Sequence, residues 1–417
     1  MRPRPARASV DTSGYHRNMR HPLLALSLVI SPFLVPCAAH ADAWSNCVQD
    51  LEVRASRERV APDTWQREVS HLQAQPDLLD KLNHQPEFKL ATWDYLASLV
   101  DDERVQDGLA AMRREQSALQ QAQTRFGVDA ATTAAVWGVE SNFGQRTGSY
   151  PIVESLLTLS CMGRRQQFFR GELFAALRIV QAGDFATQDF KGSWAGAFGQ
   201  TQFMPSTFER LAVDLDGDGH RDLINNNADA LGSTANFLKR AGWSPDLPWG
   251  IEVQPLTNLP ERMGRRVKRP AREWATLGVR PIDGRSLAAH GIGAATPTAL
   301  LQPEAGGPLF LVTKNFDAIY SYNASENYAL AIAHLADRLR GGGPLVTPWP
   351  TDDAGLSRAQ KREIQIMLIA RGHDIGAVDG ALGLRSQAAI QLEQTRLGHE
   401  ANGRAGQRLY QALKKGQ

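Results

Sequence analysis

The stretch DAATTAAVWGVESNFG, residues 129–144, decides how this chain folds. Gly127 is suited to end one helix and Asp129 to cap the next. The Ala-rich, otherwise apolar run that follows predicts a helix from Asp129 to about Glu140. Glu140 is the only ionisable residue from Ala130 to Gly144. A carboxyl group in apolar surroundings can hold a proton near neutral pH, so Glu140 is a candidate general acid; the alternative is a solvated carboxylate at a helix end.

The segments around this helix are also mainly helical. Spaced apolar residues in charged and Gln-rich sequence predict helices across residues 44–126. Further helices are predicted at Gly163–Ala182, Pro205–Val213, Asp229–Ala241 and Ser325–Leu339. Residues 245–315 hold scattered Pro and Gly with two β-prone pieces, Gly250–Val253 and Leu309–Val312, which indicates a small β-containing insertion. The predicted fold class is mainly α (α+β).

The composition of the 417 residues, 42% apolar and 22% charged, is that of a folded globular protein and excludes collagen-like or wholly disordered chains. The formal net charge is +2. A near-neutral chain lacks the concentrated basic surface that nucleic-acid binding requires, so no nucleic-acid partner is expected.

The N-terminus has the pattern of a secretory signal peptide. Arg20 precedes an apolar run, Leu23–Val35, and small residues follow up to Ala41. Residues 1–41 are therefore predicted to direct the chain to the periplasm, with Met19 as an alternative start to Met1. Cys37 leaves a lipid anchor and outer-membrane association open, although Pro36 stands where lipoprotein signals have a small residue.

Two cysteines remain after the predicted signal peptide. Cys47 and Cys161 form an even pair in a chain expected in an oxidising compartment. We predict a disulfide between them; two buried free thiols are the alternative.

A second informative segment is GSWAGAFGQTQFMPSTF, residues 192–208. Glycines, amide and hydroxyl side chains and bulky apolar residues are crowded together before Pro205, which is suited to start a helix. This mixture suits a groove that binds an amphiphilic ligand through close backbone approach and amide hydrogen bonds. A tightly packed internal turn has a similar composition.

A third segment, DLDGDGHRDLIN (residues 214–225), has the spacing of a calcium-binding loop. Asp214, Asp216 and Asp218 stand at positions 1, 3 and 5, and His220 at position 7 offers its carbonyl oxygen. Position 12 is Asn225 and not the usual bidentate Glu, which predicts weak binding of a structural Ca²⁺. The alternative is an empty Asp/Gly turn.

Taken together, four motifs resemble the membrane-bound lytic transglycosylase B family, the lytic murein transglycosylases. In chain order they are GVES, RRQQFFRGEL, GSWAGAFGQTQFMPS and DxDGDGH. The resemblance covers about residues 44–339. It implies a lysozyme-like catalytic core with a helical N-terminal lobe, residues 42–340, acting on peptidoglycan glycan strands without a cofactor for catalysis.

The resemblance also assigns roles to individual residues. Glu140 matches the sole catalytic carboxylate, and Asp229 a further cation ligand beside the loop at residues 214–229. The positions that match substrate contacts are Ser193, Gln202, Asn323 and Tyr328, with Arg164 and Arg165 lining the cleft. Phe237 stands where relatives can carry an aromatic hydroxyl, which is expected to alter one substrate contact.

The C-terminal part has its own pattern. Residues 341–355, GGGPLVTPWPTDDAG, read as a linker by composition. Residues 356–417 contain VDGALGLRSQAAI and resemble a small three-helix peptidoglycan-binding module; a degenerate helical appendage is the alternative. We expect a monomer that binds glycan strands, with other cell-wall enzymes as further partners.

The function implied is cleavage of the β-1,4 bond between N-acetylmuramic acid (MurNAc) and N-acetylglucosamine (GlcNAc) without water, leaving a 1,6-anhydroMurNAc end. Glycosidases usually use two carboxylates, and Glu140 is the one candidate near these motifs, so it acts first as acid and then as base. The alternatives are a hydrolytic, goose-type-lysozyme-like muramidase and a non-catalytic wall-binding protein.

Overall fold

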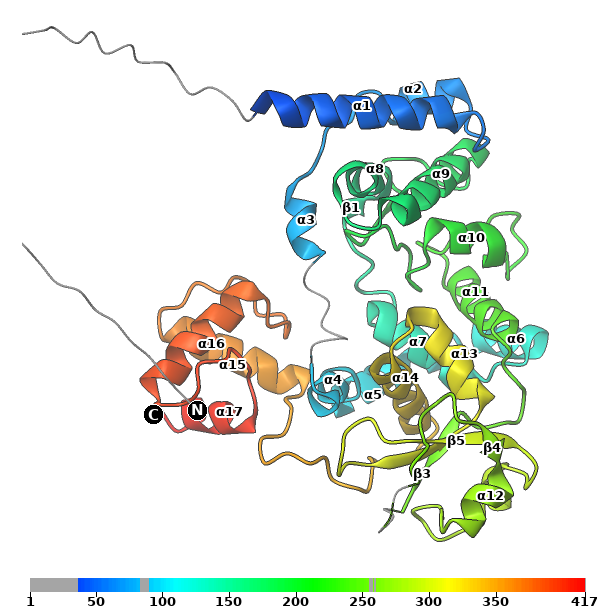
Figure 1. The fold of residues 1–417 in the computed structure, drawn as a ribbon, viewed down its shortest axis with the longest axis vertical. Helices are drawn as coiled ribbons and strands as arrows, with labels where there is room; N and C mark the ends of the chain where they lie inside the picture. The colour runs from blue at the N-terminus through cyan, green and yellow to red at the C-terminus, as the bar shows by residue number, and fades with distance from the viewer. Residues whose placement is uncertain (1–36, 83–89, 255–257, 259, 417) are drawn as a thin grey trace, which may run out of the picture. The chain divides into compact units, whose positions relative to one another are not determined.

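The computed structural model describes residues 37–82, 90–254, 258 and 260–416, with side chains from residue 43 onward, and residues 44–417 form one compact unit (Figure 1). The predicted signal peptide, including the side chain of Cys37, lies outside the described residues, apart from the backbone of residues 37–41, which belongs to α1. Among the helices described, none is both long and apolar enough to cross a membrane.

Helices dominate the described chain. They are α1 (Cys37–Ala55), α2 (Pro62–Glu68), α3 (Asp77–Lys81), α4 (Thr92–Leu99), α5 (Asp102–Arg114), α6 (Gln116–Phe126), α7 (Ala130–Ser141), α8 (Ile152–Met162), α9 (Gln166–Ala182), α10 (Pro205–Leu211), α11 (Asn227–Arg240), α12 (Ala271–Thr276), the short 3₁₀ helix η2 (Ala288–His290), α13 (Lys314–Asn323), α14 (Glu326–Leu339), α15 (Arg358–Ala370), α16 (Leu384–Arg396) and α17 (Gln407–Lys414). The strands are β1 (Tyr150–Pro151), β2 (Lys191–Gly192), β3 (Gly250–Val253), β4 (Arg269–Pro270), β5 (Pro297–Leu301) and β6 (Leu309–Val312).

Helix α7 lies at the centre of the main core. Asp129 caps it by accepting a hydrogen bond from the backbone N–H of Thr132, and every side chain from Ala131 to Trp137 is buried. Small alanine side chains let α5, α6, α11 and α14 pack closely around it. Residues 129–140 therefore form the buried helix that their composition predicts.

A second core joins α1 and α2 to α8, α9 and α10, and we call these helices, with α3, the N-terminal lobe. The structure links Cys47 of α1 to Cys161 of α8 by a disulfide, with the two Cα atoms 5.7 Å apart. Helix α9 begins at Gln166, later than the predicted Gly163, because Arg165 before it adopts a left-handed conformation.

The predicted β-containing insertion forms a four-stranded antiparallel sheet in the order β3-β6-β5-β4. Strands β3 and β6 have the predicted bounds, and Gly250 pairs with Val312. Trp274 of α12 is buried against one face of this sheet, with Val253 and Leu311.

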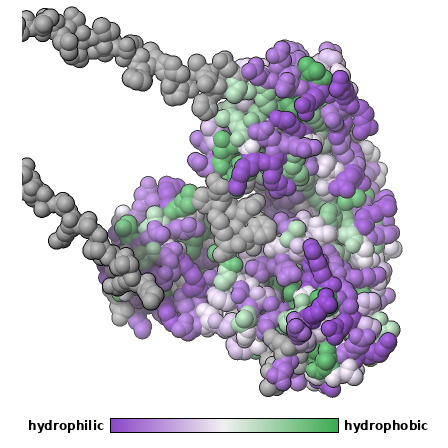
Figure 2. All heavy atoms as spheres, viewed as in Figure 1, coloured by the Kyte–Doolittle hydropathy of each residue, from purple (hydrophilic) through white to green (hydrophobic). Residues whose placement is uncertain are grey.

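Helices α15, α16 and α17 pack on a small apolar core of their own, and we call residues 356–417 the C-terminal module. Figure 2 shows apolar side chains among mainly hydrophilic ones on its visible face. The preceding segment is held against the sheet, because the backbone N–H groups of Val346 and Thr347 donate to the Glu252 carboxylate of β3.

Candidate functional site

Glu140 lies in the last turn of α7 and is half-buried. The hydroxyl group of Tyr328, on α14, donates a hydrogen bond to Oε1 of Glu140. Tyr328 is 2% exposed, and burial together with the negative charge of Glu140 raises its pKa well above the ordinary value. Tyr328 therefore stays protonated and acts as a fixed donor that orients the carboxyl group.

A second tyrosine extends this arrangement. Tyr322, on α13, donates its hydroxyl to the carbonyl oxygen of Thr201 at 2.7 Å, and its ring stacks on that of Tyr328 with the centroids 6.3 Å apart. Phe237 packs against Tyr322 with centroids 4.5 Å apart and against Phe203, so its ring belongs to this aromatic cluster. The α13–α14 pair thereby connects Glu140 to the loop at residues 199–203.

That loop belongs to the predicted groove segment and is tightly folded. Gly192 of β2 pairs with Tyr150 of β1, and a Cβ atom on it would lie 2.2 Å from the carbonyl oxygen of Ala197. The Oγ of Ser193 accepts from the N–H of Ala197 at 3.0 Å. Gln202, in a left-handed conformation, donates from Nε2 to the carbonyls of Thr147 and Gly199. Both side chains shape the backbone beside the segment that follows Glu140.

A chain of hydrogen bonds ties α7 to this loop and onward to α11. The indole N–H of Trp137 donates to Oε1 of Gln200 at 2.9 Å, and Nε2 of Gln200 donates to Oδ1 of Asn227 at 2.7 Å. Asn227 in turn donates to Glu115 at 2.8 Å. Because Trp137 is buried one turn before Glu140, this chain fixes the end of α7 relative to the loop.

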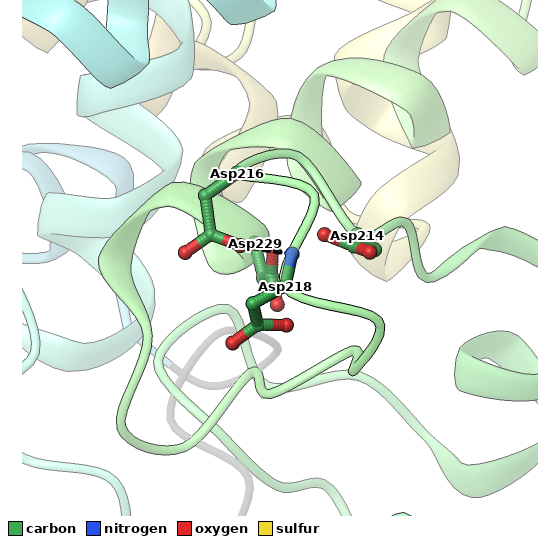
Figure 3. A group of neighbouring side chains, drawn as sticks. All are labelled: Asp214, Asp216, Asp218 and Asp229. Atoms are coloured by element: carbon green, nitrogen blue, oxygen red, sulfur yellow. Dashed lines mark hydrogen bonds between the residues drawn. The ribbon is translucent and has the colours of Figure 1, made fainter.

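The acidic loop brings four carboxylates together (Figure 3). Asp214, Asp216, Asp218 and Asp229 each offer an oxygen atom, and these atoms lie within 4.8 Å of one another. The first three come from the loop, whereas Asp229 comes from the first turn of α11. His220 is exposed and its N–H donates to Asp218 at 2.8 Å.

Backbone N–H groups hold the carboxylates in place. Asp229 is fully buried and accepts from the N–H groups of Leu215 and Asp222, at 2.7 and 2.9 Å. Burial raises the pKa of Asp229, and the negative charges of Asp216 and Asp214 raise it further. A hard divalent cation would relieve this repulsion between like charges, so the four residues fit Ca²⁺.

Asp222, at position 9 of the loop, is used differently. Its carboxylate accepts from the backbone N–H groups of Ile224 and Asn225 and from the side-chain amide of Asn225. Asn225, which replaces the usual Glu, therefore helps to close the loop.

Comparison with known proteins decides the family. The model of the transglycosylase SLT domain family matches residues 43–337, most of the chain. The chain belongs to this family. It is 32% identical to membrane-bound lytic murein transglycosylase B of Escherichia coli (strain K12) over 249 residues, which cover 58% of this chain and 65% of that relative. The chain thus spans about two thirds of the length of this curated relative.

Two solved structures of family relatives are similar over longer stretches. SltB3 from Pseudomonas aeruginosa, solved in complex with NAG-anhNAM-pentapeptide, has 39% identity and a TM-score of 0.71, covering 89% of this chain and 99% of that one. Escherichia coli Slt35, solved in complex with calcium, has 28% identity and a TM-score of 0.61, covering 70% of this chain and 92% of that one. The resemblance expected from the motifs and the mainly helical fold class are confirmed.

The remaining residues suggested by the family resemblance lie at the end of α13 and in the turn between α8 and α9. Asn323 is the exposed last residue of α13. Arg164 and Arg165 form the turn between α8 and α9, where Arg164 donates to the carbonyl of Leu82 and the guanidinium of Arg165 lies 4.5 Å from the ring centre of Phe168. The structure thus brings Tyr328 directly to Glu140 and places the arginine pair in the N-terminal lobe.

Sequence reasoning did not select Tyr322 or Gln200. Gln200 lies inside the quoted motif GSWAGAFGQTQFMPS, two residues before Gln202, and Tyr322 stands directly before the predicted site residue Asn323. The motif marks the segment, but the hydrogen bonds of Trp137 to Gln200 and of Tyr322 to Thr201 join residues 63 and 121 positions apart, and a local sequence pattern does not predict such contacts.

Proposed function

We propose that this protein is a peptidoglycan lytic transglycosylase that cleaves the β-1,4 bond between MurNAc and GlcNAc, with Glu140 as the single acid and base. The observation that carries the proposal is the Glu140 carboxyl at the end of a buried apolar helix, oriented by the Tyr328 hydroxyl. Membership of the transglycosylase SLT domain family and homology to lytic murein transglycosylases support it.

In the first step, protonated Glu140 donates its proton to the glycosidic oxygen as the bond from that oxygen to C1 of MurNAc breaks. The N-acetyl group of MurNAc shares the positive charge that develops at C1. In the second step, the Glu140 carboxylate takes the proton from the C6 hydroxyl of the same sugar. At the same time the C6 oxygen bonds to C1. The products are a 1,6-anhydroMurNAc end and a free GlcNAc hydroxyl, and no water is consumed.

The other residues of the proposed site hold the substrate. We assign Gln202, Ser193 and Asn323 to contacts with the reacting sugars, whereas the buried Tyr328 acts on the substrate through Glu140. Arg164 and Arg165 bind the carboxylates of the stem peptides in charge-assisted hydrogen bonds. The relative SltB3 was solved with a disaccharide–pentapeptide that carries an anhydro sugar, which is the product class expected here. The C-terminal module binds the wall, and the signal peptide places the enzyme in the periplasm, with outer-membrane association if Cys37 carries a lipid.

Mass spectrometry of digested sacculi tests the proposal. Release of anhydro-muropeptides is the expected result. Muropeptides with a reducing MurNAc end would identify a hydrolytic muramidase, and no released fragment would identify a non-catalytic wall-binding protein.

Tyr328→Phe is expected to lower turnover about 10- to 100-fold while leaving the fold intact. The phenyl ring keeps the packing against Tyr322, but the carboxyl loses the donor that orients it, and a hydrogen bond to a charged group is worth about 1.5–3 kcal/mol. Anhydro-muropeptide release measures the effect. Tyr320→Phe, on the same helical pair, is the matched control and should keep wild-type turnover. Equal turnover of the two variants would show that the Tyr328 hydroxyl does not orient Glu140.

Ca²⁺ is expected to bind weakly at Asp214, Asp216, Asp218, Asp229 and the His220 carbonyl and to stabilise the fold. A cation held only by the folded state at 100 times its dissociation constant adds about 2.7 kcal/mol, which raises the melting temperature by roughly 4–8 °C. A thermal melt with 10 mM CaCl₂ measures this, with NaCl at equal ionic strength as the control. Asp216→Ala should remove the shift; an unchanged wild-type melt would mean that the loop is an empty turn.

A further inference from the structure

The turn that follows Glu140 has an unfavourable backbone. Asn142 and Phe143 both adopt left-handed conformations, with φ of 52° and 59°, although neither is glycine. L-residues rarely adopt this conformation, so two in succession need support from their surroundings. The Phe143 ring supplies part of it by packing over Gly138 and Gly108, where added Cβ atoms would lie 2.6 and 2.8 Å from the ring.

The C-terminal module supplies further support through Arg358, the first residue of α15. Its Nη1 donates to Oδ1 of Asn142 at 2.8 Å, and its other nitrogens bind Asp101 and Asp107 of the α5 region at 3.3 and 3.1 Å. The side chain of Arg358 is 13% exposed and that of Asp101 is 5% exposed. Charge-assisted hydrogen bonds between side chains with so little solvent exposure are stronger than ion pairs on the surface.

A second arginine joins the same turn to the module, but here the arginine belongs to the turn and the acceptor to the module. Arg146 donates from Nη2 to the backbone carbonyl of Asp379, at 3.0 Å, within the VDGALG motif. The turn after Glu140 is therefore bonded to the module at both of its ends.

Three more features show that this contact is extensive. Arg404 binds Asp94 of α4 through two hydrogen bonds of 2.7 and 2.9 Å, and Arg362 binds Glu103 at 2.6 Å. Burial lowers the pKa of Lys361 to about 8, and the negative charges of Asp94 and Asp101 oppose this shift. In Figure 1 the N-terminal end of α15 accordingly lies beside α4 and α5.

The α5 side of the contact also reaches the helix of Glu140. Asp101, which binds Arg358, caps α5 by accepting from the N–H of Arg104, at 2.8 Å. Arg104 is buried and donates to the carbonyl oxygen of Gly138, in the last turns of α7. Arg358 thus supports the end of α7 directly through Asn142 and also through Asp101 and Arg104.

We infer that Arg358 is a positioning residue for Glu140: the C-terminal module holds the left-handed turn at Asn142, and through it the end of α7, in the geometry that the reaction requires. This inference rests on the proposed function of Glu140. It gives the module a role inside the reaction in addition to wall binding.

A soluble substrate distinguishes the positioning role of the module from its wall-binding role. A short soluble glycan fragment needs no anchoring to the wall, so loss of anchoring alone would leave its turnover unchanged. Arg358→Ala is expected to lower kcat on this fragment about 10-fold, with KM changed less than about 2-fold and with sacculus binding retained. Arg408→Ala, on α17 of the module and outside its VDGALGLRSQAAI motif, is the matched control, because its side chain is 59% exposed and pairs with an exposed Asp352.

Asn142→Gly provides the rescue. Glycine adopts the left-handed conformation without strain, so the turn no longer needs support from Arg358. The Arg358→Ala/Asn142→Gly double variant should recover most of the lost kcat. Asn142→Ala, which keeps every ion pair of the module but removes the acceptor, should lower kcat as Arg358→Ala does.

The outcomes separate the inference from the proposed function. Wild-type turnover of the soluble fragment with an anhydro product is required first, and its absence would overturn both. Given that turnover, full kcat in Arg358→Ala or in Asn142→Ala would overturn the inference alone. Unchanged kcat with lost sacculus binding would show that the module only tethers the enzyme. If the Arg358→Ala variant does not fold, the kcat of Asn142→Ala on the soluble fragment tests the inference instead.

Discussion

Glu140→Gln is expected to fold normally, to bind sacculi and to release essentially no anhydro-muropeptides. Gln keeps the size of the side chain and an oxygen that accepts from the Tyr328 hydroxyl, so the packing at the end of α7 is preserved. It cannot donate a proton to the leaving oxygen or take one from the C6 hydroxyl. General acid or base assistance is worth about 10²- to 10⁴-fold, and both steps lose it together.

Gln202→Ala is the comparison for this variant. Its side chain binds the carbonyls of Thr147 and Gly199, so its loss loosens the loop beside Glu140 but leaves the proton carrier in place. It should therefore reduce turnover less than Glu140→Gln does. If Glu140→Gln kept more than about a tenth of wild-type turnover, a loss below about 1.4 kcal/mol, another residue would have to be the acid.

Removal of the disulfide by Cys47→Ala/Cys161→Ala is expected to cause the largest loss of stability. The two cysteines are 114 residues apart, and in the loop-closure model a cross-link over a loop of this length contributes about 4–5 kcal/mol. The expected drop in melting temperature is roughly 5–15 °C. Thermal unfolding followed by circular dichroism measures it.

Wild-type protein with a reducing agent is the matched control for the disulfide, and it should melt at the temperature of the double variant. Both samples lack the Cys47–Cys161 cross-link between α1 and α8, and both keep the apolar residues of α1 in the core shared with α8 and α9. A variant within about 1 kcal/mol of wild type would show that packing alone constrains α1.

Some elements could be predicted because their signals are local. The capping Asp129, the Ala-rich run and Glu140 lie within one continuous stretch, and the structure folds it as the predicted helix. Strands β3 and β6 also have the predicted bounds, since short β-branched and apolar pieces between turn residues are typical of strands.

Other elements were missed because their patterns are ambiguous. Helix α8, IVESLLTLSCM, is buried on nearly every side, and an apolar run without a polar face has no clear helical period. Helix α13 was also missed, although Thr313 caps it, because it follows directly on strand β6 and begins at the end of the region predicted to be β-containing, residues 245–315.

The sequence by itself determined the mainly helical fold class, a carboxyl at the end of an apolar helix and a loop with Asp residues at calcium-binding spacing. Each depends on residues a few positions apart, where backbone geometry alone sets the neighbours. Only the tertiary structure decided that Tyr328, 188 residues from Glu140, donates to it, and that Arg358, 216 residues from Asn142, holds the turn beside it. Such contacts depend on how whole helices pack and on which left-handed turns the packed chain stabilises, and no local pattern encodes that choice.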